Sequence, residues 1–93
     1  MIVGIVQVEL HIPEAQTLKD KRAVLKSVKG EMRSRFNISI AEVDANEKWQ
    51  RATLGIAAVG QDRAALEPSV NEFTQWIRRH PLIQIIRIDQ EYW

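Results

Sequence analysis

The sequence predicts an α+β domain in which strands and helices follow one another in the order βαββαβ. Four segments alternate apolar and polar residues, as half-buried strands do, and two longer segments repeat apolar residues every three or four positions, as amphipathic helices do. The length of 93 residues suits one domain, here residues 1–93. This order folds most economically as two split β-α-β units, which form a four-stranded antiparallel sheet with both helices on one face, the ferredoxin-like plan.

The first strand is predicted over residues 2–12, because alternate apolar side chains share one face. These core-facing residues are Val6, Val8, Leu10 and Ile12. The first helix is predicted to run from residue 18 to about Phe36. Thr17 is placed to cap it, and Asp20 at the third helical position completes an approximate capping box.

Three further segments complete the sheet. We expect strands over residues 37–44, 50–60 and 83–93, with a short turn over 45–49. The open face of this sheet is predicted to be too polar for a second core, so that it faces water, a partner subunit or a ligand. Its predicted residues are Gln7, Glu9, His11, Arg51, Thr53, Arg87, Asp89 and Glu91.

The second helix carries an apolar stripe at spacings of four, three and four residues. This stripe consists of Leu66, Val70, Phe73 and Ile77. Pro68 leaves two starts open: a helix that begins after Asp62 and is kinked near its start, or one that begins near Glu67. The helix is expected to end before Pro81, because the residue preceding a proline resists helical geometry.

Charge is distributed unevenly along the chain, although the net charge is only +1. Residues 18–36 hold seven basic and two acidic residues, and the rest of the chain holds six basic and ten acidic ones. On a helical projection five of the cations form one stripe beside the buried face. These are Lys19, Arg22, Lys26, Lys29 and Arg33, called the basic stripe below.

The basic stripe opposes helix stability. Like charges at i,i+3 or i,i+4 cost about 0.2–0.5 kcal/mol per pair, and cations in the first turn meet the positive end of the helix dipole. One reading is a phosphate- or RNA-binding surface at the start of the helix and along its stripe. The other is a solvated face neutralised by Glu67 and Glu72 of the second helix.

No constellation for catalysis or for a cofactor is visible. His11 and His80 stand alone in the sequence, and there is no Ser-His-acid order, no Gly-rich phosphate loop and no cysteine. We interpret the carboxylates of Glu42, Asp44 and Glu47 as members of ion pairs rather than metal ligands. The prediction is therefore a protein that is not an enzyme and that has no metal and no cofactor.

The three tryptophans are expected to pack against the domain. Trp49 is predicted to lie over a strand end, with stacking on a nucleic-acid base as the alternative. Trp76 and Trp93 are predicted to be packing residues.

Two segments resemble the YlxP-like proteins, a bacterial family of unknown function. They are LKDKRAVLKSVKGEMRSRFNISIAEVD (residues 18–44) and WQRATLGIAAV (residues 49–59), and the similarity extends over nearly the whole chain. The resemblance implies the ferredoxin-like fold and a bacterial cytoplasm. Members tend to be encoded near translation-initiation and ribosome-maturation factors, which implies a connection with RNA or the ribosome. The family offers no catalytic residues to carry over.

The sequence thus leads to two functional hypotheses. The first is a cytoplasmic, non-enzymatic module that binds RNA or the ribosome through the basic stripe. The second is a homo-oligomer, such as a homodimer, that pairs through the open sheet face or through an edge strand such as the isoleucine-rich residues 83–93. No membrane partner is expected, because no apolar run has the length needed to cross a bilayer and the first residues lack the features of a signal peptide.

Overall fold

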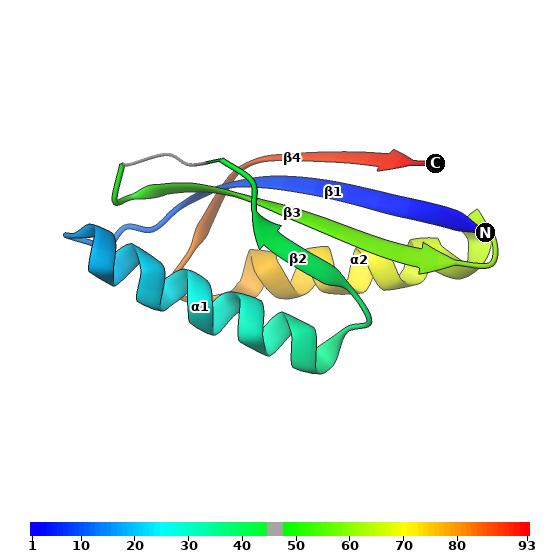
Figure 1. Ribbon diagram of the computed structural model, residues 1–93, viewed down its shortest axis with the longest axis horizontal. Coiled ribbons are helices and arrows are strands. Elements are labelled where there is room, and N and C mark those ends of the chain that lie inside the picture. The colour runs from blue at the N-terminus through cyan, green and yellow to red at the C-terminus, as the bar shows by residue number, and fades with distance from the viewer. Residues whose placement is uncertain (45–47) are drawn as a thin grey trace.

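A computed structural model describes residues 1–44 and 48–93 of the chain. Its elements are β1 (Ile2–His11), α1 (Leu18–Arg35), β2 (Ser39–Glu42), β3 (Arg51–Gly60), α2 (Arg63–Arg79) and β4 (Gln84–Tyr92). The strands form one antiparallel sheet in the order β2-β3-β1-β4, and both helices cover the same face of it (Figure 1). The predicted ferredoxin-like α+β fold is confirmed.

β2 is shorter than the sequence predicted. It comprises residues 39–42 rather than 37–44, because the N–H of Ile38 turns back to the carbonyl of Phe36. Contact with β3 continues one residue past the strand, where the N–H of Val43 donates to the carbonyl of Thr53 at 2.9 Å. The predicted turn at 45–49 includes residues 45–47, which lie outside the described part of the chain, as does Glu47 of the acidic cluster.

α2 begins at Arg63, which decides between the two starts that the sequence left open. The Oδ1 atom of Asp62 accepts a hydrogen bond of 2.8 Å from the N–H of Ala65, so Asp62 is the N-cap. Pro68 therefore lies inside the helix, at its sixth residue. The proline removes the bond to the carbonyl of Ala64, which belongs to an exposed residue and remains open to water.

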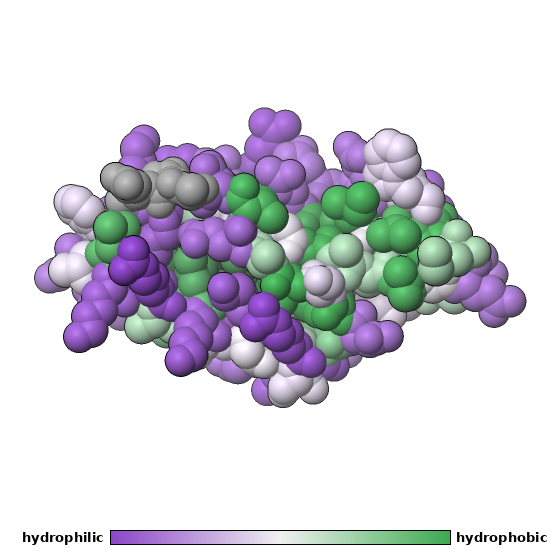
Figure 2. All heavy atoms as spheres, viewed as in Figure 1, coloured by the Kyte–Doolittle hydropathy of each residue, from purple (hydrophilic) through white to green (hydrophobic). Residues whose placement is uncertain are grey.

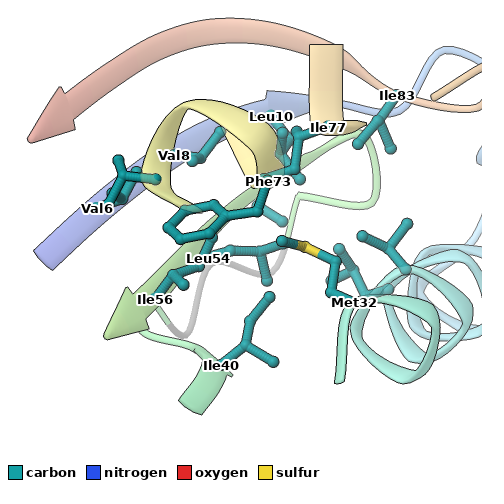
Figure 3. Close-up of a cluster of buried hydrophobic side chains, with 14 of the residues drawn as sticks. Val6, Val8, Leu10, Met32, Ile40, Leu54, Ile56, Phe73, Ile77 and Ile83 are labelled. Atoms are coloured by element: carbon teal, nitrogen blue, oxygen red, sulfur yellow. The ribbon is translucent and has the colours of Figure 1, made fainter. Parts of the chain in front are cut away.

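The core lies between the sheet and the two helices. One face of β1 and β3 and the inner faces of α1 and α2 supply most of its apolar side chains, and β2 and the connecting segments supply the others. Figure 3 shows the Phe73 ring surrounded by side chains from both helices, from β1, β2 and β3, and from the segment between α2 and β4. The labelled members are Val6, Val8, Leu10, Met32, Ile40, Leu54, Ile56, Phe73, Ile77 and Ile83. The period-2 and period-3.6 patterns of the sequence therefore identified the core-facing residues.

The predicted cap of α1 is present. Thr17 Oγ1 accepts a hydrogen bond of 3.1 Å from the N–H of Asp20, and Asp20 Oδ2 in turn accepts one of 3.0 Å from the N–H of Gln16. We expect Thr17→Ala to lower the free energy of unfolding by about 1 kcal/mol, measured by urea denaturation. Thr17→Ser keeps the accepting oxygen and should restore most of the loss. Equal losses in both variants would contradict this role of the hydroxyl.

The open sheet face is polar at one end only. There Arg51 pairs with Glu9 across β3 and β1, and Arg87 pairs with Asp89 within β4 at 2.9 Å. The other end of this face carries exposed apolar side chains, namely Ile5, Val59 and Trp93. The sequence predicted a face too polar for a second core and did not predict these apolar side chains. The prediction of a packed Trp93 was wrong, because this residue is 72% exposed.

Candidate nucleic-acid interface

The basic stripe lies on the flank of α1 that faces away from α2. Lys19, Arg22, Lys26 and Arg33 are exposed and Lys29 is half-buried, while the neighbouring helix face packs on the sheet. The opposite flank of α1 lines a groove shared with α2. Figure 2 shows long hydrophilic side chains gathered along α1, whereas hydrophobic ones gather toward the end of the molecule where β3 ends. The five predicted residues therefore share one solvent-facing surface.

Arg33 connects this surface to the edge of the sheet. Its Nη2 donates a hydrogen bond of 2.9 Å to the carbonyl of Ile40 in β2. That carbonyl points away from β3, because alternate residues of an antiparallel strand turn their backbone groups to opposite sides and Val43 bonds inward. Arg33 therefore covers the free edge of β2 as well as belonging to the stripe, a contact that the sequence did not predict.

No carboxylate neutralises the basic stripe within residues 1–44 and 48–93. Each ion pair found there involves other basic residues, and Glu67 bonds Arg63 of its own helix at 2.6 Å. Glu72 lines the groove on the opposite flank of α1, together with Arg35 and Arg79. The neutralisation that the sequence left open is thus absent from the described residues.

The start of α1 is occupied by its own cap. The hydroxyl of Thr17 and the carboxylate of Asp20 already bind backbone N–H groups there, and a carboxylate repels a phosphate. The part of the hypothesis that placed an anion on the helix N-terminus gains no support from this arrangement. A phosphate-binding surface on α1 depends on the side chains of the stripe.

Lys21 has a structural environment despite its place in the basic segment. It is only 3% exposed, its Nζ donates to the carbonyl of Lys48 at 3.2 Å, and it pairs with Glu42 at 3.5 Å. It thus connects α1 to the end of β2 and to the residues that precede β3. The signal for this burial was its position on the helical projection, where it falls among Leu25, Val28 and Met32.

A second feature lies at the end of the molecule where α1 begins. Trp49 is 49% exposed rather than packed, and it borders a hollow of about 340 Å³ shared with His11 and Arg51. Gln50 holds this segment in place, because its side-chain amide donates to the carbonyls of Pro13 and Ala15 just before α1. The exposed indole therefore stands next to Lys48, whose carbonyl accepts a hydrogen bond from Lys21 in the first turn of the stripe-bearing helix.

A groove of about 710 Å³ lies between α1 and α2. Trp76 forms its apolar wall, edge-on to both Phe36 and His80. Nδ1 of His80 accepts the N–H of Leu82 at 3.2 Å, so in the neutral ring Nε2 carries the proton, 3.9 Å from Glu31. Glu31 and Glu72 balance the charges of Arg35 and Arg79 along this groove, in contrast to the basic stripe. The groove is assembled from segments that are distant in the chain, so no local sequence pattern indicated it.

Within residues 1–44 and 48–93, no group of three or more His, Asp or Glu side chains is arranged to hold a metal ion. None of the described helices has the length and apolar character needed to cross a membrane.

Comparison with known proteins identifies relatives without a known role. The family described as "Protein of unknown function (DUF503)" matches residues 3–90. The "Uncharacterized protein YlxP" of Bacillus subtilis (strain 168) is 36% identical over 83 residues, which cover 89% of this chain and 90% of that protein.

Proposed function

We propose that this chain, which belongs to the DUF503 family of proteins of unknown function, is a cytoplasmic, non-enzymatic module that binds RNA, free or on the ribosome. The basic stripe of α1 is the proposed contact surface. The family brings no known activity with it, and the support for this function comes from the side chains of this chain.

The observation that carries the proposal is the unneutralised stripe. Four exposed cations and the half-buried Lys29 share one flank of α1, and no described carboxylate pairs with any of them. The repulsion among like charges three or four residues apart is therefore not offset by an acid within the described fold. A polyanion would offset it, because Lys and Arg side chains release condensed counterions when they bind phosphates.

The geometry favours contacts with the RNA backbone. Exposed lysines and arginines along about 20 Å of helix bind phosphates without reading sequence. Trp49 adds a flat aromatic surface close to the first turn of α1, of the kind on which an unpaired base stacks. We therefore propose single-stranded RNA, or a single-stranded segment of ribosomal RNA, as the ligand.

Binding should depend steeply on salt. Four phosphate contacts to a single strand give a log–log salt slope near −3, equivalent to about fiftyfold weaker binding between roughly 50 and 200 mM salt. The measurement is fluorescence anisotropy with a mixed pool of labelled single-stranded RNA, followed by co-sedimentation with ribosomal subunits over the same salt series. Binding that does not respond to salt would overturn the proposal.

A charge-reversed variant connects this binding to the stripe. Lys19, Arg22 and Lys26 are exposed, and none of them forms an ion pair within residues 1–44 and 48–93, so the triple change to Glu should leave the fold intact. We expect the salt slope to weaken by about 2, the share of three contacts. The matched control is Arg35/Arg78/Arg79→Glu, which changes net charge equally on other parts of the helix layer and should retain the slope. Equal loss in both variants would mean that net charge, not the stripe, governs binding.

A further inference from the structure

β4 is an edge strand that is paired on one side only. It pairs with β1 from Gln84 to Tyr92 with one irregularity at Ile86, and no described strand lies on its other side (Figure 1). Val3 and Trp93 exchange both backbone hydrogen bonds, at 2.7 and 2.8 Å. Alternate residues of a strand turn their backbone groups to opposite sides. This pair therefore shows that Arg87, Asp89, Glu91 and Trp93 turn theirs toward β1. Ile88, Gln90 and Tyr92 therefore present their N–H and C=O groups to the free edge.

We propose that β4 pairs antiparallel with β4 of a second copy of the chain, around a two-fold axis at Ile88. The result is a homodimer with a continuous eight-stranded sheet, and each copy contributes the same strand, as a two-fold interface requires. The strand is long for an exposed edge, with nine residues, and edges of this kind are templates for pairing with another chain.

The charges on β4 select the register. With the axis at Ile88, Arg87 of each copy stands opposite Asp89 of the other on the open face of the sheet. An axis at Asp89 would bring the two Asp89 side chains together, and an axis at Gln90 would place Asp89 opposite Glu91. Among these three registers, which all match the outward backbone groups, only the one at Ile88 brings no like charges face to face.

The side chains of one copy are already arranged for this register. Arg87 and Asp89 form an ion pair of 2.9 Å on the open face, so two copies would place four alternating charges in a square. On the helix face Ile88 is half-buried against the core, and at the axis its exposed part would cover the same residue of the second copy. Ile86, the extra residue at the irregularity opposite Glu9 and Leu10, lies beyond this central region.

The proposal is independent of RNA binding, but it has a consequence for it. β4 and β2 are the opposite edges of the sheet. Pairing through β4 would leave α1 and its basic stripe exposed in both copies, at the two far ends of the dimer. If the stripe binds RNA, the dimer has two such surfaces and binds a long strand more tightly than a monomer does.

Single cysteines test the register directly, because the natural chain has none. In the proposed dimer the two residues at position 88 lie about 5.5 Å apart between Cα atoms, within disulfide range. Ile88→Cys should therefore form a covalent dimer under mild oxidation, seen by non-reducing electrophoresis. Gln90→Cys is the control: its two copies are offset by four residues, about 13 Å along the strand, and should not cross-link. Equal cross-linking of both variants, or of neither, would overturn the register.

A charge swap tests the same interface without the cysteines. Arg87→Asp and Asp89→Arg each place like charges opposite one another, and each should weaken dimerisation about tenfold or more. The double variant restores opposite charges and should dimerise about as well as the natural chain. The readout is sedimentation equilibrium from low micromolar to near-millimolar protein, with circular dichroism and the unfolding midpoint recorded for every variant.

Two results of these measurements would rule out the dimer. A natural chain that is monomeric over the whole range, or a dimer that neither single substitution weakens, would overturn the proposal. Each single substitution also breaks the Arg87–Asp89 pair within one chain, so circular dichroism and the unfolding midpoint decide whether a monomeric variant is still folded. None of these measurements involves RNA, so failure of the dimer leaves the proposed function standing, and failure of RNA binding leaves the dimer standing.

Discussion

Phe73→Ala is expected to remove about 3–5 kcal/mol from the free energy of unfolding. The ring is fully buried and lies edge-on to Phe36, with centroids 6.1 Å apart. In Figure 3 it lies among side chains from both layers of the domain, so its loss opens a cavity that neither helix can close alone. A domain of this size has a total stability of about 5–14 kcal/mol, and the variant should therefore be only marginally folded at room temperature.

Urea denaturation followed by circular dichroism measures this loss. Phe73→Leu retains most of the apolar volume and should fall between the alanine variant and the natural chain. Val59→Ala is the surface control: Val59 is 54% exposed, and its truncation should change stability by less than about 1 kcal/mol. A small loss for Phe73→Ala, close to that of the control, would contradict the central position of the ring.

Lys21→Met is expected to cost about 1–3 kcal/mol, although it replaces a charged residue by an apolar one of similar length. The carbonyl of Lys48 and the carboxylate of Glu42 would both lose a donor. Glu42 is exposed, so water can hydrate its carboxylate once the lysine is removed. The expected loss is therefore smaller than that for a fully buried ion pair with one partner removed. Thermal or urea unfolding measures the difference.

Lys19→Met is the matched control, two residues earlier in the same turn. Lys19 is exposed and part of the basic stripe, so its replacement should change stability by no more than about 0.5 kcal/mol. The order is reversed for RNA binding. Lys19→Met should weaken the affinity for RNA directly, whereas Lys21→Met should affect it only through the loss of stability. Equal unfolding midpoints for the two variants would show that Lys21 is not a structural residue.

α1 therefore carries two kinds of cation with different environments. Lys21 faces the sheet and connects segments that are distant in the sequence, whereas the basic stripe faces solvent on an adjacent side. In the sequence, Lys21 and the stripe together give residues 18–36 their high positive charge. The charge available to a ligand comes from the stripe, and the number of phosphate contacts inferred from the salt slope should reflect those side chains alone.

The order of elements and the core residues could be read from local patterns. The alternation of Val6, Val8 and Leu10 and the helical spacing of Val70, Phe73 and Ile77 each follow from the geometry of one element, because burial repeats every two residues in a strand and every 3.6 in a helix. The caps at Thr17 and Asp62 are equally local, since each side chain bonds an N–H three residues ahead. The location of the basic stripe on one flank of α1 was predicted for the same reason.

The partners of these residues depended on the assembled domain. Glu67 was a candidate to neutralise the stripe, but the turn of α2 places it beside Arg63. Lys21 contacts Lys48 and Arg33 contacts β2, and both partners lie seven or more positions away in the chain. Trp49 borders a hollow that it shares with His11 of β1. Trp93 and the apolar end of the open face came to lie on the surface because none of the described elements covers that side of the sheet. Periodicity along the chain records which side of an element is buried; it carries no information on which distant side chain lies opposite, because that is decided by how the elements pack.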